Sequence, residues 1–86
     1  MKLETIVVPV ESSNIEVLTR VPANDLMIVE FVNGTKYLYT GVDVATFNQL
    51  VDAESVGKEF NSVIKKGDYN YLKVWDEKSW NTRVQI

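Results

Sequence analysis

The stretch Asn33–Thr40, which reads NGTKYLYT, decides the fold because it joins a tight-turn signal to a strand pattern. Asn-Gly is the strongest short-range signal for a β-hairpin, and a type I′ turn needs positive φ at both of its central residues. Side chains alternate along a strand, so Tyr37 and Tyr39 point to one side of the sheet and Leu38 points to the other. We predict a type I′ turn here, followed by a strand that ends at Thr40.

Further strands are predicted before this turn. Residues 26–32 are apolar except for Glu30, which is typical of a central strand with a buried face. The β-prone extension 1–10 adds strand character, and Pro9 restricts a strand there to an edge or a strand end. Residues 15–21 alternate, which predicts one face with Ile15, Val17, Thr19 and Val21 and another with Glu16, Leu18 and Arg20.

After Gly41 the apolar spacing changes to three and four residues, which indicates helices. We predict one helix that Asp43 caps, because Val42, Val44, Phe47, Leu50 and Val51 include the three- and four-residue spacings of an amphipathic helix. A second helix follows, with Val56, Phe60, Val63 and Ile64 on one stripe, and a further strand is predicted within 68–75. The fold class is therefore α+β, a single domain over residues 1–86 in which two short helices cover one face of an antiparallel β-meander of three to five strands.

The composition excludes most catalytic chemistry. The 86 residues include no cysteine and no histidine, which removes disulfides, thiolate chemistry, the usual general base and the commonest metal ligand. We therefore expect no enzyme, no catalytic residues, no metal and no cofactor. No apolar run approaches the roughly 20 residues that a membrane helix requires, so we expect a cytoplasmic protein without a membrane partner.

The net charge of −3 disfavours non-specific binding to a long polyanion. Basic residues nevertheless outnumber acidic ones from Ser55 onward. These lysines either solubilise the surface or form a local positive face on an acidic protein.

Four segments together resemble a known family. They are Ser12-Ser13-Asn14-Ile15, the run 29–34, the Tyr37-Leu38-Tyr39 triplet followed by Val42, and Ser55-Val56-Gly57-Lys58-Glu59-Phe60-Asn61 with Ile64. In this order they resemble the KTSC domain over about residues 11–74. That family is named for the C-terminus of some lysyl-tRNA synthetases and also occurs as a free-standing protein in bacteria and phages. Through the synthetase association, the resemblance implies RNA binding.

The paired tyrosines allow three interpretations. Tyr37 and Tyr39 pack against the helices, or form a platform on which bases stack, or bury their rings while their hydroxyls reach the rim of a pocket. Leu38 lies between Lys36 and Thr40 on what should be the wetter face. The tyrosines are therefore predicted on the helix-covered face, which favours core or pocket rim.

The start of the second helix supplies a second candidate site. Ser55, Gly57 and Lys58 would hold an anion at the helix N-terminus, and Asn61 would contact a ligand one turn later. The structural alternative is that Ser55 caps the helix and Gly57 permits close packing. Three more cations, Lys65, Lys66 and Lys73, would form a basic surround.

We predict a non-catalytic binding module for RNA or a small nucleotide-type anion. The alternative is a module for protein interaction or oligomerisation, such as a phage accessory protein. In that case Trp75 and Trp80, in the tail 75–86, would anchor a homo-oligomer interface, because tryptophan is enriched in such contacts.

Overall fold

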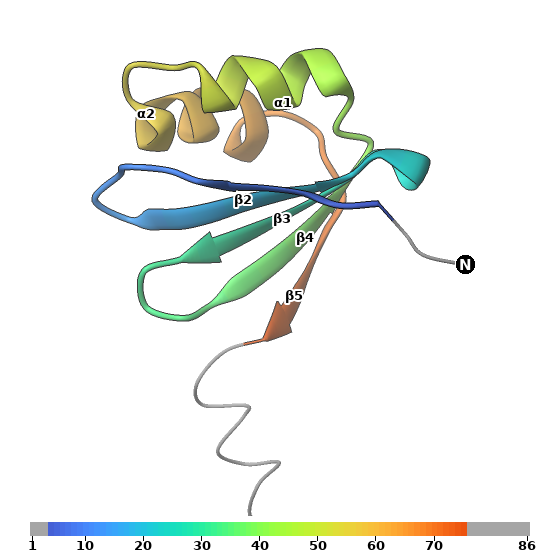
Figure 1. The fold of residues 1–86 in the computed structure, drawn as a ribbon, viewed down its shortest axis with the longest axis horizontal. Coiled ribbons are helices and arrows are strands. Elements are labelled where there is room, and N and C mark those ends of the chain that lie inside the picture. The colour runs from blue at the N-terminus through green and yellow to red at the C-terminus, as the bar shows by residue number, and fades with distance from the viewer. Residues whose placement is uncertain (1–3, 76–86) are drawn as a thin grey trace, which may run out of the picture.

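The computed structural model describes residues 4–75, in which five strands form one antiparallel sheet with helices over one of its faces (Figure 1). Each strand pairs with the next along the chain, so the sheet is a meander and the α+β prediction is confirmed. The strands are β1 (Ile6–Pro9), β2 (Ile15–Val21), β3 (Leu26–Phe31), β4 (Lys36–Thr40) and β5 (Tyr71–Trp75). The helical elements are a 3₁₀ turn (Pro22–Asn24), α1 (Val44–Val51), α2 (Val56–Phe60) and a π-helical turn (Asn61–Lys65) that continues α2.

The strand register sorts the side chains onto two faces. The covered face lies under the helices and includes Leu18, Met27, Val29, Tyr37, Tyr39 and Tyr71. The open face carries a row that crosses all five strands, made of Val7, Thr19, Ile28, Leu38 and Leu72. Within residues 4–75, no helix lies over the open face (Figure 1). The tyrosine pair is therefore on the helix side, as predicted.

The core lies between the covered face and the helices. Ile15, Leu18 and Val29 are fully buried on the sheet side. They meet an apolar stripe from the helix layer made of Phe47, Leu50, Val56, Phe60 and Ile64. Each such side chain contributes about 1.5–3 kcal/mol when it leaves water. No helix among the described residues has the length and apolar character needed to cross a membrane.

Side-chain caps begin both helices. The Asp43 carboxylate accepts a hydrogen bond from the Thr46 backbone N–H at 2.9 Å, which confirms the predicted cap. This hydrogen bond also holds the pKa of Asp43 below its usual value. At α2, the Ser55 hydroxyl accepts from the Lys58 N–H at 3.4 Å. The two caps satisfy backbone donors that the first turn of a helix leaves unpaired.

The predicted alternation of β2 is wrong at its start. Ile15 and Leu18 are both fully buried, although a strict alternation would place them on opposite faces. The pairing shifts between Ile15 and Val17, so Phe31 faces Ile15 while Glu30 faces Val17. This β-bulge inserts one residue and resets the side-chain alternation.

The turn between β3 and β4 forms a hairpin as predicted but is not type I′. Gly34 has a φ of 91°, whereas Asn33 is not among the residues with positive φ. The Gly34 N–H donates to the Phe31 carbonyl at 2.9 Å. Asn33 acts through its side chain instead, accepting a hydrogen bond from the Thr35 N–H at 3.0 Å. One left-handed residue is enough in a loop longer than two residues.

Arg20 is a charged residue within the buried set. It is 5% exposed, and its guanidinium donates to the Asp25 carboxylate in an ion pair. Asp25 has a left-handed backbone, with a φ of 49°, and ends the 3₁₀ turn between β2 and β3. The Asp25 carbonyl in turn accepts from the Val42 N–H at 2.9 Å. Arg20 thus ties this turn to the start of the helix layer.

Candidate functional site

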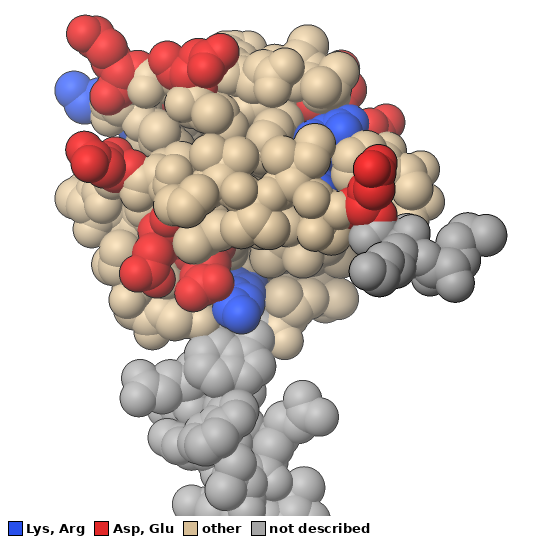
Figure 2. Space-filling view, viewed as in Figure 1, with Lys and Arg blue, Asp and Glu red and all other residues tan. Residues whose placement is uncertain are grey.

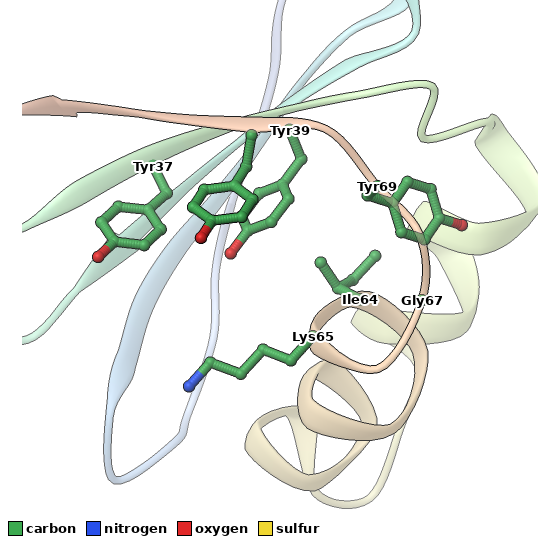
Figure 3. A pocket seen from close by; sticks show the side chains of 7 residues that line it. Tyr37, Tyr39, Ile64, Lys65, Gly67 and Tyr69 are labelled. Atoms are coloured by element: carbon green, nitrogen blue, oxygen red, sulfur yellow. The ribbon is translucent and has the colours of Figure 1, made fainter.

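All four tyrosines of the chain line one pocket of about 400 Å³ at the edge of the helix layer. We call it the tyrosine pocket. Its lining comes from β4, the π-helical turn, the following loop and β5, and consists of Tyr37, Tyr39, Ile64, Lys65, Gly67, Tyr69 and Tyr71 (Figure 3). Segments far apart in the sequence therefore build one aromatic site.

The rings run from the core to the surface. Tyr39 is 4% exposed and meets Phe60 edge to face, with ring centroids 5.7 Å apart. Tyr37 is half-buried and lies parallel to Tyr71, at 5.9 Å and an interplanar angle of 11°. Tyr71 is 65% exposed. Tyr39 therefore belongs to the core, while Tyr71 offers a ring to solvent and Tyr37 lies between these extremes.

The Tyr39 hydroxyl keeps its proton at neutral pH. Burial, together with the neighbouring phenols of Tyr37 and Tyr71, raises the pKa of Tyr39 to about 12. The side chain of Lys65 extends to the same side as the hydroxyls of Tyr37 and Tyr39 (Figure 3). An ammonium group and two phenol groups, which are hydrogen-bond donors, therefore face one region.

The wall opposite the sheet depends on the π-helical turn and the loop after it. Ile64 and Lys65 are adjacent in this turn, and both line the pocket. A Cβ at Gly67 would lie 2.5 Å from the Val63 carbonyl oxygen and 2.9 Å from the Tyr69 ring. Glycine is thus required for Tyr69 to fold against the helix end. Single π turns within helices occur frequently at functional sites.

A second pocket of about 380 Å³ adjoins the first and shares Tyr37 and Lys65 with it. We call it the hairpin pocket because residues of the β3–β4 turn line it. Its other lining residues are Asn14, Phe31, Val32, Asn33, Thr35 and Lys73. Among residues 4–75, the two linings hold two lysines and no acidic residue. The whole chain has 12 acidic and 9 basic residues, and Figure 2 shows acidic side chains spread over one face of the molecule.

The structure divides the predicted site residues into two groups. Tyr37, Tyr39, Lys65 and Lys73 lie around the two joined pockets. Lys66 is exposed and follows the π-helical turn, but it belongs to neither lining.

The second group surrounds a separate hollow, which we call the serine pocket, of about 370 Å³. Ser55, Gly57, Lys58 and Asn61 line it together with the loop before β2. A Cβ at Gly57 would lie 2.9 Å from Asn14 Oδ1 and 3.2 Å from Ser12 Oγ, so Gly57 allows α2 to pack closely on this loop.

The serine pocket has the wrong charge for an anion. Its lining also includes Glu11 and Glu54, so two carboxylates accompany one lysine. The geometry supports the capping role of Ser55 and the packing role of Gly57.

Sequence reasoning missed Tyr69 and Tyr71. A signal was present, because Tyr69-Asn70-Tyr71 repeats the spacing of Tyr37 and Tyr39. Tyr71 lies directly opposite Tyr39 in the register between β4 and β5. A meander places consecutive strands side by side, so the two tyrosine pairs are brought together by the topology.

The predicted interface residues fall at the end of the described range and beyond it. Trp75 ends β5, and its backbone pairs with Lys36. Trp80 lies outside the described residues. Among residues 4–75 there is also no cluster of three or more side chains that could hold a metal ion.

Comparison with known proteins agrees with the motifs and the fold. The KTSC domain profile matches residues 11–75, which include β2 to β5 and every residue of the tyrosine pocket. The chain belongs to the KTSC domain family. The crystal structure of a KTSC domain protein from Yersinia pestis superposes with a TM-score of 0.74 at 30% identity, covering 84% of this chain and 100% of that one. β1 lies before the family match.

Two bacterial sequences are also similar to this KTSC domain. A protein from Tsukamurella paurometabola is 40% identical over 57 residues, which make up 66% of this chain and 85% of that relative. An uncharacterised protein from Stutzerimonas stutzeri is 33% identical over 67 residues, covering 78% of this chain and 94% of that relative.

Proposed function

We propose that this KTSC domain is a non-catalytic binding module for a nucleotide-type anion, which the tyrosine pocket holds. One observation carries the proposal: four tyrosines and Lys65 converge on one pocket, and none of the described residues that line it is acidic, although the chain as a whole is acidic. An aromatic wall with a single cation suits a ligand that combines a flat ring with a phosphate.

Each part of the ligand has a matching group in the pocket. The exposed Tyr71 ring offers a face for a base, and stacking on an aromatic side chain contributes about 1–3 kcal/mol per base. Tyr37 lies parallel behind Tyr71 and supports this ring. Lys65 would bind the phosphate as a point charge. The net charge of −3 favours a short ligand over a long polyanion.

The proposal is tested by calorimetric titration of the chain with AMP. Replacing Tyr71 by leucine should weaken AMP binding about tenfold, because the stacking face is lost. Lys65→Met should weaken binding and flatten its salt dependence, because a phosphate contact releases counterions. Lys66→Met is the matched control, since this neighbouring lysine lies outside the lining, and it should leave affinity unchanged. No binding of AMP, or binding that neither pocket variant alters, would reject the proposal.

A second candidate function is self-association through the open face, because its row of five side chains is uncharged from edge to edge. The same face carries Glu30 and Lys36, whose charged groups lie 3.7 Å apart. A second copy related by a two-fold axis that passes between these two residues would set each of these charges against its opposite.

Sedimentation velocity tests this second candidate. The unmodified chain and a Val44→Glu control on α1 should sediment as dimers. Leu38→Glu should sediment as a monomer, because it places a carboxylate within the uncharged row. A monomeric unmodified chain at the highest soluble concentration would reject self-association.

A further inference from the structure

The tyrosine pocket and the hairpin pocket are neighbouring compartments. Tyr37 and Lys65 line both of them. Tyr37 lies parallel to Tyr71 on the tyrosine side, and it meets Phe31 edge to face, at 5.9 Å and 77°, on the hairpin side. The Tyr37 ring therefore contributes to an aromatic wall in both compartments.

The two compartments are similar in size but differ in chemistry. Their volumes are about 400 and 380 Å³, each within the range of a small-ligand pocket. The tyrosine pocket is mainly aromatic, whereas the hairpin pocket adds the side-chain amides of Asn14 and Asn33. Both amide oxygens accept hydrogen bonds from the protein, at 2.9 Å from the Ser12 hydroxyl and at 3.0 Å from the Thr35 N–H. The amide NH₂ groups are thus the donors with which these residues can read a base edge.

The hairpin pocket is held in shape by the fold itself. The Val32 N–H donates to the Asn14 carbonyl at 3.0 Å, which joins the β3–β4 turn to the loop before β2. The Phe31 ring is in turn seated on Phe60 at 5.9 Å. A compartment with fixed walls costs a ligand little reorganisation on binding.

We infer that the ligand contains two nucleosides joined through a phosphate, with one base in each compartment and the linking phosphate at Lys65. This inference rests on the proposed function and extends it from one base to two. Within the described part of the chain, Lys65 is the charged residue common to both compartments, so it marks the position that a bridging anion would occupy. Lys73 also lines the hairpin side. A soluble dinucleotide and a two-nucleotide unit of single-stranded RNA share this chemistry.

Calorimetry with three small ligands tests the inference. The dinucleoside monophosphate ApA should bind at least about tenfold more tightly than AMP, because a second base enters the hairpin pocket. The methylphosphonate analogue of ApA has the same two bases and an uncharged link. It should bind about tenfold more weakly than ApA, the usual loss when a charge-assisted contact is removed.

Protein variants then locate the linking phosphate. Lys65→Met should bind ApA and its methylphosphonate analogue equally, whereas Lys66→Met should keep the full preference for the charged link. Circular dichroism of both variants checks that each is folded. If octaadenylate binds more tightly than the number of two-nucleotide registers along it accounts for, the ligand is an RNA strand. If its affinity per register equals that of ApA, the ligand is a free dinucleotide.

The outcomes separate the inference from the proposed function. If AMP binds and ApA binds no more tightly, the two-base inference is wrong and the nucleotide proposal stands. If the folded Lys65→Met variant keeps the preference for the charged link, the phosphate position is wrong. If neither AMP nor ApA binds, both proposals fail together.

Discussion

Both faces of the sheet carry apolar side chains, but the covered face buries them far more completely than the open face. On β3, the neighbours Met27 and Val29 are fully buried on the covered face, while Ile28 between them is only half-buried on the open face. On β4, Tyr39 is buried and Leu38 is half-buried. Apolar side chains on a strand therefore do not by themselves determine on which face the helices pack.

What distinguishes the covered face is its fit to the helix layer. Phe60 fills the space between Phe31 and Tyr39, with both rings edge to face at 5.9 and 5.7 Å. Aromatic pairs of this geometry contribute about 0.5–1.5 kcal/mol beyond burial of area. The open face instead accommodates the Glu30–Lys36 ion pair, which would be costly to bury. Shape and charge together select the side on which the helices pack.

The sharpest test of this comparison removes the same atoms from each face. Leu18→Ala on the covered face should lower the free energy of unfolding by about 2–5 kcal/mol, because Leu18 is fully buried and a cavity remains. Leu38→Ala on the open face should cost about 1 kcal/mol or less, because this side chain already contacts water. Urea unfolding followed by circular dichroism measures both. Equal losses would show that the open face is covered as fully as the helix face.

A second test concerns how closely the helix layer seats on the sheet and its loops. Gly57→Ala should destabilise the fold by about 1 kcal/mol, because the new Cβ would lie 2.9 Å from Asn14 Oδ1 and overpacking outweighs the gain in helix propensity.

The control for this substitution is a double-mutant cycle. In an Asn14→Ala background the side-chain oxygen that the new Cβ would meet is gone, so Gly57→Ala should become neutral or stabilising. An equal cost in both backgrounds would show that Asn14 is not what opposes the side chain.

The smallest expected effect is a pH dependence that comes from the covered face. The pKa of Tyr39 is about 12 in the folded chain and near 10 when unfolded. Between these values the unfolded state loses the proton first, so stability that is present below pH 10 is lost as pH rises toward 12. As the pH is raised through 10, the urea midpoint of unfolding should fall less steeply in Tyr39→Phe than in the unmodified chain. An unchanged slope in Tyr39→Phe would indicate that other groups cause the loss.

Much of the fold was predictable because its signals are local. The caps at Asp43 and Ser55 act within one helical turn, and the hairpin at Gly34 needs one residue with positive φ. The π-helical turn and the β2 bulge were not predictable, since both depend on partners from elsewhere in the chain. The candidate site was half predictable: Tyr37, Tyr39, Lys65 and Lys73 were named, while Tyr69 and Tyr71 were not.

The amino-acid sequence was enough to determine the order of the elements, the helix caps and the side of β4 on which the two tyrosines lie. These follow from steric preferences and hydrogen bonds between residues close together in the chain. Only the tertiary structure decided that four tyrosines share one pocket, that Lys58 is separated from them while Lys65 joins them, and that Arg20 is buried. The physical reason is that these outcomes depend on strand register and on packing between distant segments, which the alternation of residues along one strand does not specify.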